Sequence, residues 1–227
     1  LYGLPRDFQL VACWKRQMCI RDSHFAVQFQ NNKIADVALK SPGEHNALNA
    51  LSTFVVAREL GWSVNCALQG LASYQGVKRR QEVIGTPHGV TLIEDFAHHP
   101  TAVKVTIDAI REKYIDKADG ELFCLFEPRS ATSRRKIFQK DYVKAFSSGD
   151  KILIAKAFDQ SKISETDRLS TSELVQDLNS SGQVAAEFAS SDDMVAHLKS
   201  VVKKGDVVLI MSNGGFDGIY KKLQSAL

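Results

Sequence analysis

The sequence lacks several features that would place it in a class at once. No phosphate-binding loop of the form Gly-x-x-x-x-Gly-Lys-Ser/Thr occurs in its 227 residues. No apolar run approaches the ~20 residues that a helix needs to span a bilayer. The net charge of +3 is too small to indicate nucleic-acid binding. We therefore expect neither a membrane protein nor a nucleic-acid-binding protein.

Cysteine is scarce and shows no pairing pattern. The four cysteines are scattered along the chain, at Cys13, Cys19, Cys66 and Cys124. Cys66 and Cys124 lie in apolar segments, so we expect them to be reduced residues of the core. A reducing, cytoplasmic location fits this pattern. With 44% hydrophobic and 24% charged residues, the composition is that of an ordinary soluble globular protein.

The segment Leu1–Ser23 does not fit the rest of the chain. It has no amphipathic period, and it has neither the apolar region nor the small-residue cleavage site of a signal peptide. The stretch from Lys15 to Ser23 is similar to translated sequencing-adapter read-through. We expect residues 1–23 to be a non-native segment joined to a truncated gene, with a genuine linker as the alternative.

The remainder of the chain changes pattern near Arg80. Residues 24–39 predict a hairpin, and residues 47–60 and 64–73 predict helices. From Arg80 onward short apolar strands alternate with helices, which predicts an α/β domain with a mainly parallel sheet covered on both faces. The predicted strands are 90–93, 122–126, 151–155, 184–188 and 207–211. The predicted helices are 101–114, 135–146, 172–178, 194–203 and 216–227, and the polar segment 156–168 predicts a surface loop.

The most informative stretch is Glu94-Asp95-Phe96-Ala97-His98-His99-Pro100-Thr101. Pro100 suits the first turn of a helix, so the residues before it lie on a loop at the carboxyl end of a strand. Open α/β sheets bind ligands at that edge. The paired histidines are then either a loop whose rings bond to the backbone or a substrate or nucleotide site. A metal site is disfavoured, because no Cys or His lies nearby at zinc-ligand spacing.

Four further segments favour the substrate or nucleotide site. They are Gly43-Glu44-His45-Asn46-Ala47-Leu48-Asn49, Val77-Lys78-Arg79-Arg80-Gln81-Glu82, Phe126-Glu127-Pro128-Arg129-Ser130-Ala131-Thr132 and Met211-Ser212-Asn213-Gly214-Gly215-Phe216. In order and spacing, the five segments together resemble the Mur ligases, ATP-dependent enzymes that form amide bonds in peptidoglycan synthesis. The resemblance covers about Phe25 to Leu227. Within the family it is strongest to the murein peptide ligase branch, whose acceptor is a recycled tripeptide. Phe96 and the Pro128-Arg129-Ser130 run favour that branch over the one that adds L-alanine.

The resemblance implies a domain organisation. Residues 24–79 would be the carboxyl-terminal remnant of a central ATP-binding domain, and residues 80–227 a Rossmann-like C-terminal domain. The family's phosphate-binding loop lies upstream of the part that is recognisable here. We therefore expect the chain to be the C-terminal portion of a ligase and to be inactive alone.

The resemblance also implies roles for single residues. The candidates for nucleotide binding are His45, Asn46, Asn49, Arg80 and Asp95. Asn46 has the alternative role of a helix N-cap, and Arg80 that of a solvated basic linker residue. His98 and His99 would line the catalytic cleft and orient a phosphate or the incoming amine. The candidates for substrate binding are Arg129, Ser130, Thr132, Ser212, Asn213 and Gly214.

The implied reaction joins UDP-N-acetylmuramate to the tripeptide L-alanyl-γ-D-glutamyl-meso-diaminopimelate in peptidoglycan recycling. It uses ATP and Mg²⁺ and passes through an acyl phosphate, and most Mg²⁺ ligands are expected outside this chain. Two alternatives remain. One is the same portion of a UDP-N-acetylmuramate–L-alanine ligase, and the other is a peptide-binding domain without catalysis, which the missing phosphate loop favours.

Overall fold

The computed structural model describes residues 8–11, 23–115 and 119–227. They form two compact units, divided between Gly76 and Val77. This division lies three residues before the 79/80 boundary expected from the sequence. Most of the segment expected to be non-native, residues 1–7 and 12–22, lies outside the described part.

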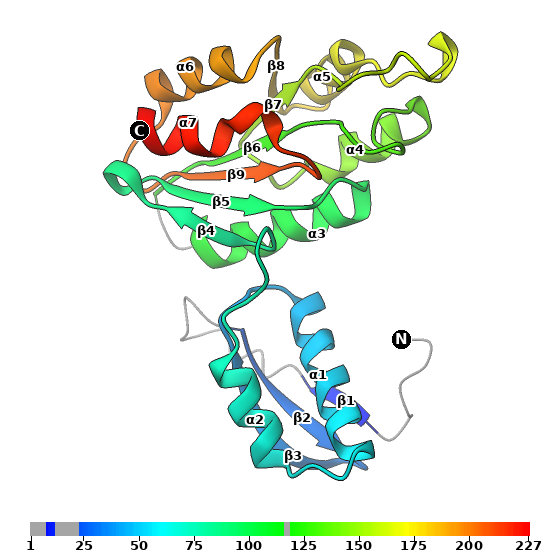
Figure 1. Ribbon diagram of the computed structural model, residues 1–227, viewed down its shortest axis with the longest axis vertical. Coiled ribbons are helices and arrows are strands. Elements are labelled where there is room, and N and C mark those ends of the chain that lie inside the picture. Colours follow the sequence, from blue (N-terminus) through cyan, green and yellow to red (C-terminus); the bar gives the residue numbers. More distant parts are fainter. Residues whose placement is uncertain (1–7, 12–22, 116–118) are drawn as a thin grey trace. The chain divides into compact units, whose positions relative to one another are not determined.

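The first unit is a small antiparallel sheet covered by two helices (Figure 1). Its strands are β1 (Phe8–Val11), β2 (Ser23–Phe29) and β3 (Asn32–Leu39), in that order, and its helices are α1 (Glu44–Glu59) and α2 (Val64–Ser73). The expected hairpin is present. Gln30 and Asn31 both have positive φ angles, 48° and 63°, which suit a tight two-residue turn. Strand β1 lies within the segment expected to be non-native and pairs with β2.

Two expectations for this unit are wrong. Helix α1 begins at Glu44, three residues earlier than expected, with Gly43 as its N-cap and no capping side chain. Asn46 is therefore not an N-cap but lies in the first turn of the helix. Cys66 is not a core residue: it is exposed in α2, whereas Cys124 is buried. The spacing of apolar residues in α2 did not predict which side of this helix packs on the sheet, so the exposure of Cys66 was not foreseen.

The second unit is the expected α/β domain. Its sheet contains β4 (Glu82–Gly85), β5 (Thr91–Asp95), β6 (Leu122–Phe126), β7 (Lys151–Ala155), β8 (Val184–Phe188) and β9 (Val207–Met211). The strand order is β4-β5-β9-β6-β7-β8. All neighbours are parallel except the edge strand β4, which pairs antiparallel with β5.

Helices cover both faces of this sheet (Figure 1). One face carries α3 (Pro100–Ile110), α4 (Gln139–Ala145) and α5 (Thr171–Ser180), and the other carries α6 (Ser191–Val201) and α7 (Ile219–Ala226). Strand β6 shows why both faces are apolar. Cys124 and Phe126 pack toward α3–α5, while Phe123 and Leu125 pack toward α6 and α7. Residues of successive strand positions point to opposite faces, so a strand buried on both sides is apolar throughout.

Short irregular turns complete the second unit. They are single 3₁₀ turns at Pro87–Gly89, Lys136–Phe138, Glu165–Asp167 and Phe216–Gly218, and a wider π-type turn at Arg111–Ile115. Helix α4 is consequently shorter than the predicted helix 135–146, since its first residues form a 3₁₀ turn. Within the described ranges, no helix combines the length and apolar character needed to cross a membrane.

Candidate active site at the carboxyl edge of the sheet

The carboxyl ends of three adjacent strands bring the predicted site segments together. In the sheet β9 lies between β5 and β6, and Met211 is in register with both Asp95 and Phe126. The next residues are joined through the backbone: Ser212 donates its N–H to the Asp95 carbonyl (3.2 Å), and Glu127 donates to the Met211 carbonyl (3.1 Å). Segments more than 80 residues apart in the sequence therefore meet at one edge, as the sequence predicted.

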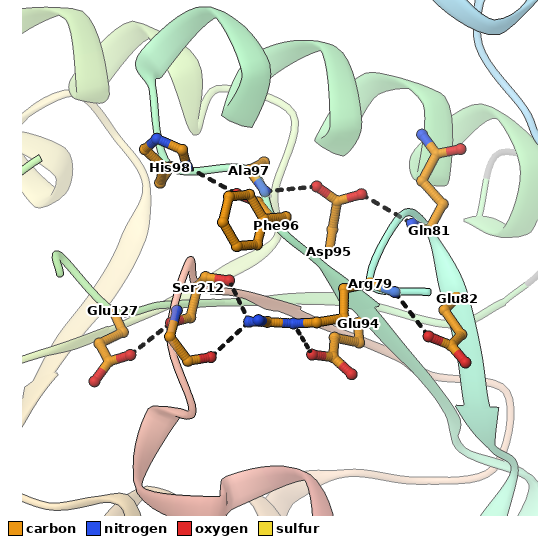
Figure 2. A network of polar contacts seen from close by, with 11 residues as sticks. Arg79, Gln81, Glu82, Glu94, Asp95, Phe96, Ala97, His98, Glu127 and Ser212 are labelled. Atoms are coloured by element: carbon orange, nitrogen blue, oxygen red, sulfur yellow. Dashed lines mark hydrogen bonds and ion pairs between the residues drawn. The ribbon is translucent and has the colours of Figure 1, made fainter. Parts of the chain in front are cut away.

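Arg79 is the centre of the polar network at this edge (Figure 2). Its Nε donates to Glu94 Oε1 (2.6 Å), and its Nη2 donates to the carbonyls of Ser212 (3.0 Å) and Gly214 (2.5 Å). Burial opposes the charge on Arg79, but the contacts with Glu94 and the neighbouring Tyr220 outweigh it and raise the pKa of the guanidinium. Arg79 therefore fixes the loop after β9 to the start of the second unit. No local pattern in the sequence predicts this role.

Arg80 has a different environment from its neighbour. Its side chain is exposed, and its guanidinium lies 5.4 Å from the centre of the Phe96 ring. The guanidinium of Arg79 approaches the same ring at 5.1 Å. The structure thus leaves the donors of Arg80 accessible at the surface, whereas those of Arg79 are engaged.

Asp95 is buried, and both of its carboxylate oxygens accept hydrogen bonds from the backbone. Oδ1 accepts from the N–H of Ala97 (2.7 Å) and Oδ2 from that of Gln81 (2.9 Å), as Figure 2 shows. Gln81 has a positive φ of 51°, a conformation that a non-glycine residue rarely adopts. The Asp95 side chain therefore orders the loops on both sides of β5. This geometry fits an ordering role better than direct contact with a nucleotide.

The two histidines have opposite hydrogen-bonding arrangements. Nδ1 of His98 lies 2.9 Å from the Phe96 carbonyl, and because a carbonyl only accepts, this nitrogen carries the proton. Nδ1 of His99 instead accepts from the N–H of Thr101 (3.3 Å), so His99 is the N-cap of α3. In the neutral form of His98 the lone pair therefore lies on Nε2, whereas in the neutral form of His99 the proton lies on Nε2.

The histidine loop is held from α4. Tyr142, fully buried, donates its hydroxyl to the His98 carbonyl (2.5 Å), and the Phe138 ring meets the His99 ring edge-on at 4.9 Å. Burial raises the pKa of Tyr142, so its hydroxyl remains a donor at physiological pH. Sequence reasoning did not identify Tyr142, because it occupies an ordinary core position of a helix.

The loop after β6 carries the predicted substrate residues. Glu127 is buried, and its Oε2 accepts from the Ser212 hydroxyl (2.5 Å), which in turn accepts from the N–H of Gly214 (2.9 Å). Arg129 Nη1 lies 3.4 Å from Glu127 Oε1. The structure therefore brings Arg129, Ser212 and Gly214 together through Glu127, which was not among the predicted site residues. Its position directly after a strand was the available signal.

The other predicted substrate residues are placed differently. The Ser130 hydroxyl stabilises its own turn by accepting from the N–H of Ser133 (2.9 Å) and donating to the Ser133 hydroxyl (2.8 Å). Thr132 is exposed, and no side-chain contact joins it to the Arg79 network in the described residues. Asn213 is half-buried, and its shielded Oδ1 accepts no hydrogen bond from any residue that the structure describes.

Three of the residues predicted to bind the nucleotide belong to the first unit. The side chain of Asn46 donates to the Pro42 carbonyl (2.6 Å), which stabilises the entry into α1. His45 is half-buried and Asn49 is exposed on the same helix. These residues share the first turns of one helix, and the structure gives Asn46 a structural contact in addition to any contact with a ligand.

The described residues do not offer a built metal site. No group of three or more His, Cys, Asp or Glu side chains is gathered within the described ranges. At the sheet edge, Glu94 is paired with Arg79, Asp95 accepts two backbone N–H groups, and Glu127 is bonded to Ser212. These donor sets do not fit Mg²⁺, which requires several open oxygen ligands.

The fold is a Rossmann-like α/β domain, a class of domain that binds ligands at the carboxyl ends of its parallel strands. Residues 79–214 match the family described as Mur ligase, glutamate ligase domain. The chain therefore belongs to the Mur ligase family, as the sequence predicted.

Relatives with both kinds of acceptor are similar to the chain. The UDP-N-acetylmuramate–L-alanine ligase of Clostridium acetobutylicum is 32% identical over 192 residues, which cover 85% of this chain and 41% of that protein. The UDP-N-acetylmuramate–L-alanyl-γ-D-glutamyl-meso-2,6-diaminoheptandioate ligase of Haemophilus influenzae is 32% identical over 207 residues, covering 90% and 43%. Because the chain is equally identical to both relatives, the identities do not indicate which acceptor it binds. The chain spans less than half the length of either relative.

A solved structure gives the same family. The murein peptide ligase from Psychrobacter arcticus is 32% identical to the chain with a TM-score of 0.64, and the match covers 97% of this chain and 44% of that one. The UDP-N-acetylmuramate–alanine ligase from Thermotoga maritima has a TM-score of 0.74 at 19% identity, covering 96% and 45%, and so shows the shared fold.

Proposed function

We propose that this chain is the acceptor-binding portion of an ATP-dependent ligase that joins UDP-N-acetylmuramate to L-alanyl-γ-D-glutamyl-meso-diaminopimelate. The observation that carries the proposal is Arg129, a partly exposed guanidinium held at the carboxyl edge of the sheet beside Ser212 and Gly214. A guanidinium pairs well with a carboxylate. The tripeptide has several carboxylates and L-alanine has one, so a fixed arginine at this edge suits the larger acceptor.

The residues of this chain would position the reactants rather than activate them. In the reaction, a carboxylate of UDP-N-acetylmuramate takes the terminal phosphoryl group of ATP, the acceptor amine attacks the acyl phosphate, and phosphate leaves. Arg80, with His45, Asn46 and Asn49, would contact the nucleotide. Asp95 would act indirectly, by ordering the loops that carry Gln81 and Ala97.

Two site assignments complete the proposal. His98 and His99 would orient a phosphate or the amine, and no residue of the chain is assigned as the base. The shielded Oδ1 of Asn213 is an acceptor that a bound peptide could satisfy. Mg²⁺ would be held mainly by ATP and by residues outside this chain, because the edge carboxylates do not fit it. No phosphate-binding loop occurs in the 227 residues, so the chain alone would form no amide.

Titration of the chain with the two acceptors tests the proposal. Isothermal calorimetry is expected to give a lower Kd for the tripeptide than for L-alanine, because more carboxylates are available to Arg129 and its neighbours. Equal or tighter binding of L-alanine would favour the alanine-adding branch. Amide formation from ATP, UDP-N-acetylmuramate and tripeptide by the pure chain would contradict the statement that it is inactive alone.

Arg129→Ala is expected to weaken tripeptide binding by about 2 kcal/mol, or about 30-fold, because a charge-assisted hydrogen bond to a carboxylate is lost. The affinity for ATP should stay unchanged. Arg135→Ala is the matched control, since Arg135 is an exposed arginine of the same loop whose side chain is outside the network. Loss of ATP affinity with unchanged tripeptide affinity in Arg129→Ala would show that the assignment is wrong.

A further inference from the structure

Two groups pack closely against the Arg129 side chain. The Phe158 ring lies over its guanidinium, with the Arg129 Cζ 3.7 Å from the ring centre. The second group is the backbone of Gly214. A Cβ atom built on Gly214 would fall 2.1 Å from Cδ, 2.2 Å from Nε and 2.9 Å from Cζ of Arg129. These separations are far inside van der Waals contact, so the arginine occupies the space that any other residue at position 214 would fill.

The third contact fixes the rotation of the guanidinium in its own plane. Nη1 of Arg129 lies 3.4 Å from Glu127 Oε1, and the other oxygen of Glu127 is bonded to Ser212 (2.5 Å). Because Glu127 is buried and held by a second partner, it is a fixed reference for the arginine. Arg129 still exposes 32% of its side chain. Phe158, Gly214 and Glu127 therefore restrict the side chain, and part of the guanidinium remains accessible.

Phe158 comes from a segment that the sequence predicted to be a surface loop. That loop is tied to the site independently of the Phe158 ring: the Arg134 guanidinium donates to the carbonyl of Asp159, and the backbone N–H of Phe158 donates to the Pro128 carbonyl (3.0 Å). Phe158 is 44% exposed, so its contact with Arg129 is not a by-product of core burial. An arginine packed against a ring in this way has the direction of its planar fork of donors restricted.

We infer that Phe158 and Gly214 are positioning residues that hold Arg129 edge-on to a carboxylate of the acceptor peptide. The inference rests on the proposed function and adds the specificity of the site. Phe158 occupies one face of the guanidinium, and the planar donors that remain accessible suit an anion that lies in the guanidinium plane. Position 214 requires glycine because a side chain there would collide with Arg129. Backbone conformation is not the reason, since the φ angle of Gly214 is not in the left-handed region.

Two pairs of variants of the full chain test this inference. Gly214→Ala places a methyl group against Arg129 without removing any donor, and Gly215→Ala is its control, because a Cβ at Gly215 meets no atom within 4 Å. Phe158→Leu removes the ring while keeping an apolar side chain, and Phe158→Tyr restores it. Binding of the tripeptide and of ATP is measured by calorimetry. The ¹⁵N Nε–Hε signal of Arg129, assigned with Arg129→Lys, reports the order of the side chain.

Gly214→Ala is expected to weaken tripeptide binding about tenfold and Phe158→Leu about threefold, with ATP binding unchanged in both. Both variants should shift or broaden the Arg129 Nε–Hε signal, whereas Gly215→Ala and Phe158→Tyr should resemble the wild type. Wild-type tripeptide affinity in Gly214→Ala and Phe158→Leu would overturn the inference and leave the proposed function intact. If the wild type binds no tripeptide while Gly214→Ala still perturbs the Arg129 signal, the proposed acceptor is wrong and the positioning of Arg129 stands.

Discussion

Asp95→Ala is expected to lower the free energy of unfolding of the second unit by about 4 kcal/mol, because two backbone N–H groups lose a charged acceptor at once. The N–H of Ala97 and that of Gln81 would both be left without their partner. Gln81 would in addition lose the contact that holds its left-handed backbone conformation. Urea unfolding followed by far-UV circular dichroism measures the change. Tryptophan fluorescence follows the first unit separately, since both tryptophans, Trp14 and Trp62, precede Val77.

Asp206→Ala is the matched control for this substitution. Asp206 is fully buried just before β9, at the opposite end of the sheet, and it too accepts two backbone N–H groups, from Glu121 (2.9 Å) and Lys203 (2.8 Å). The loss of stability should be similar in the two variants. Only Asp95→Ala should also weaken ligand binding at the carboxyl edge. A stability change below about 1 kcal/mol in Asp95→Ala would mean that the two hydrogen bonds do not order this edge.

Arg79→Ala is expected to destabilise the second unit by about 3 kcal/mol and to weaken tripeptide binding. The substitution leaves the Glu94 carboxylate, 13% exposed, without its partner, and it releases the carbonyls of Ser212 and Gly214. The loop that carries Gly214 would then be free to move away from Arg129. Urea unfolding and tripeptide calorimetry measure the two effects.

The neighbouring arginine separates these effects from a simple loss of charge. Arg80→Ala removes the same charge from an exposed side chain, so it should change stability by less than about 0.5 kcal/mol and weaken the binding of ATP rather than of the tripeptide. Equal effects of the two substitutions on both ligands would contradict the division of roles between the adjacent arginines.

The strands were predictable because of how they are buried. Strands β6 and β9 are apolar throughout, and β7 is apolar after Lys151, since helices cover both faces. Their predicted bounds agree with the structure. Strand β4 was missed. It is a short edge strand in which only Val83 and Ile84 are apolar, and its pairing depends on a neighbour that no local pattern reveals.

The site was predictable where it follows strand ends and unpredictable where it depends on contacts across the chain. Ser212 was located because it directly follows an apolar strand, and Asp95 because it lies at the end of one. Asp95 was expected on the loop after this strand but is the last residue of β5. The role of Arg79 was not predicted, because its partner carbonyls lie 133 and 135 residues away in the sequence. Phe158 was predicted only as part of a polar surface loop, because its contact with Arg129 likewise depends on two separate segments of the chain. Ser130 and Ser212, both predicted to bind substrate, use their hydroxyls in hydrogen bonds within the protein, which the sequence did not indicate.

The central position of β9 has a consequence for how the second unit folds while it is being synthesised. Although β9 is the last strand in the sequence, it separates β5 from β6 in the sheet. While the chain emerges from the ribosome, β4 and β5 cannot join the β6–β8 part until residues 207–211 have been made. The two pairings that join these parts of the sheet therefore wait for residues 207–211, and pairing over such sequence separations is slow. Ser212 and Gly214 follow this strand directly, so the completion of the hydrophobic core and the assembly of the proposed acceptor site would be one event.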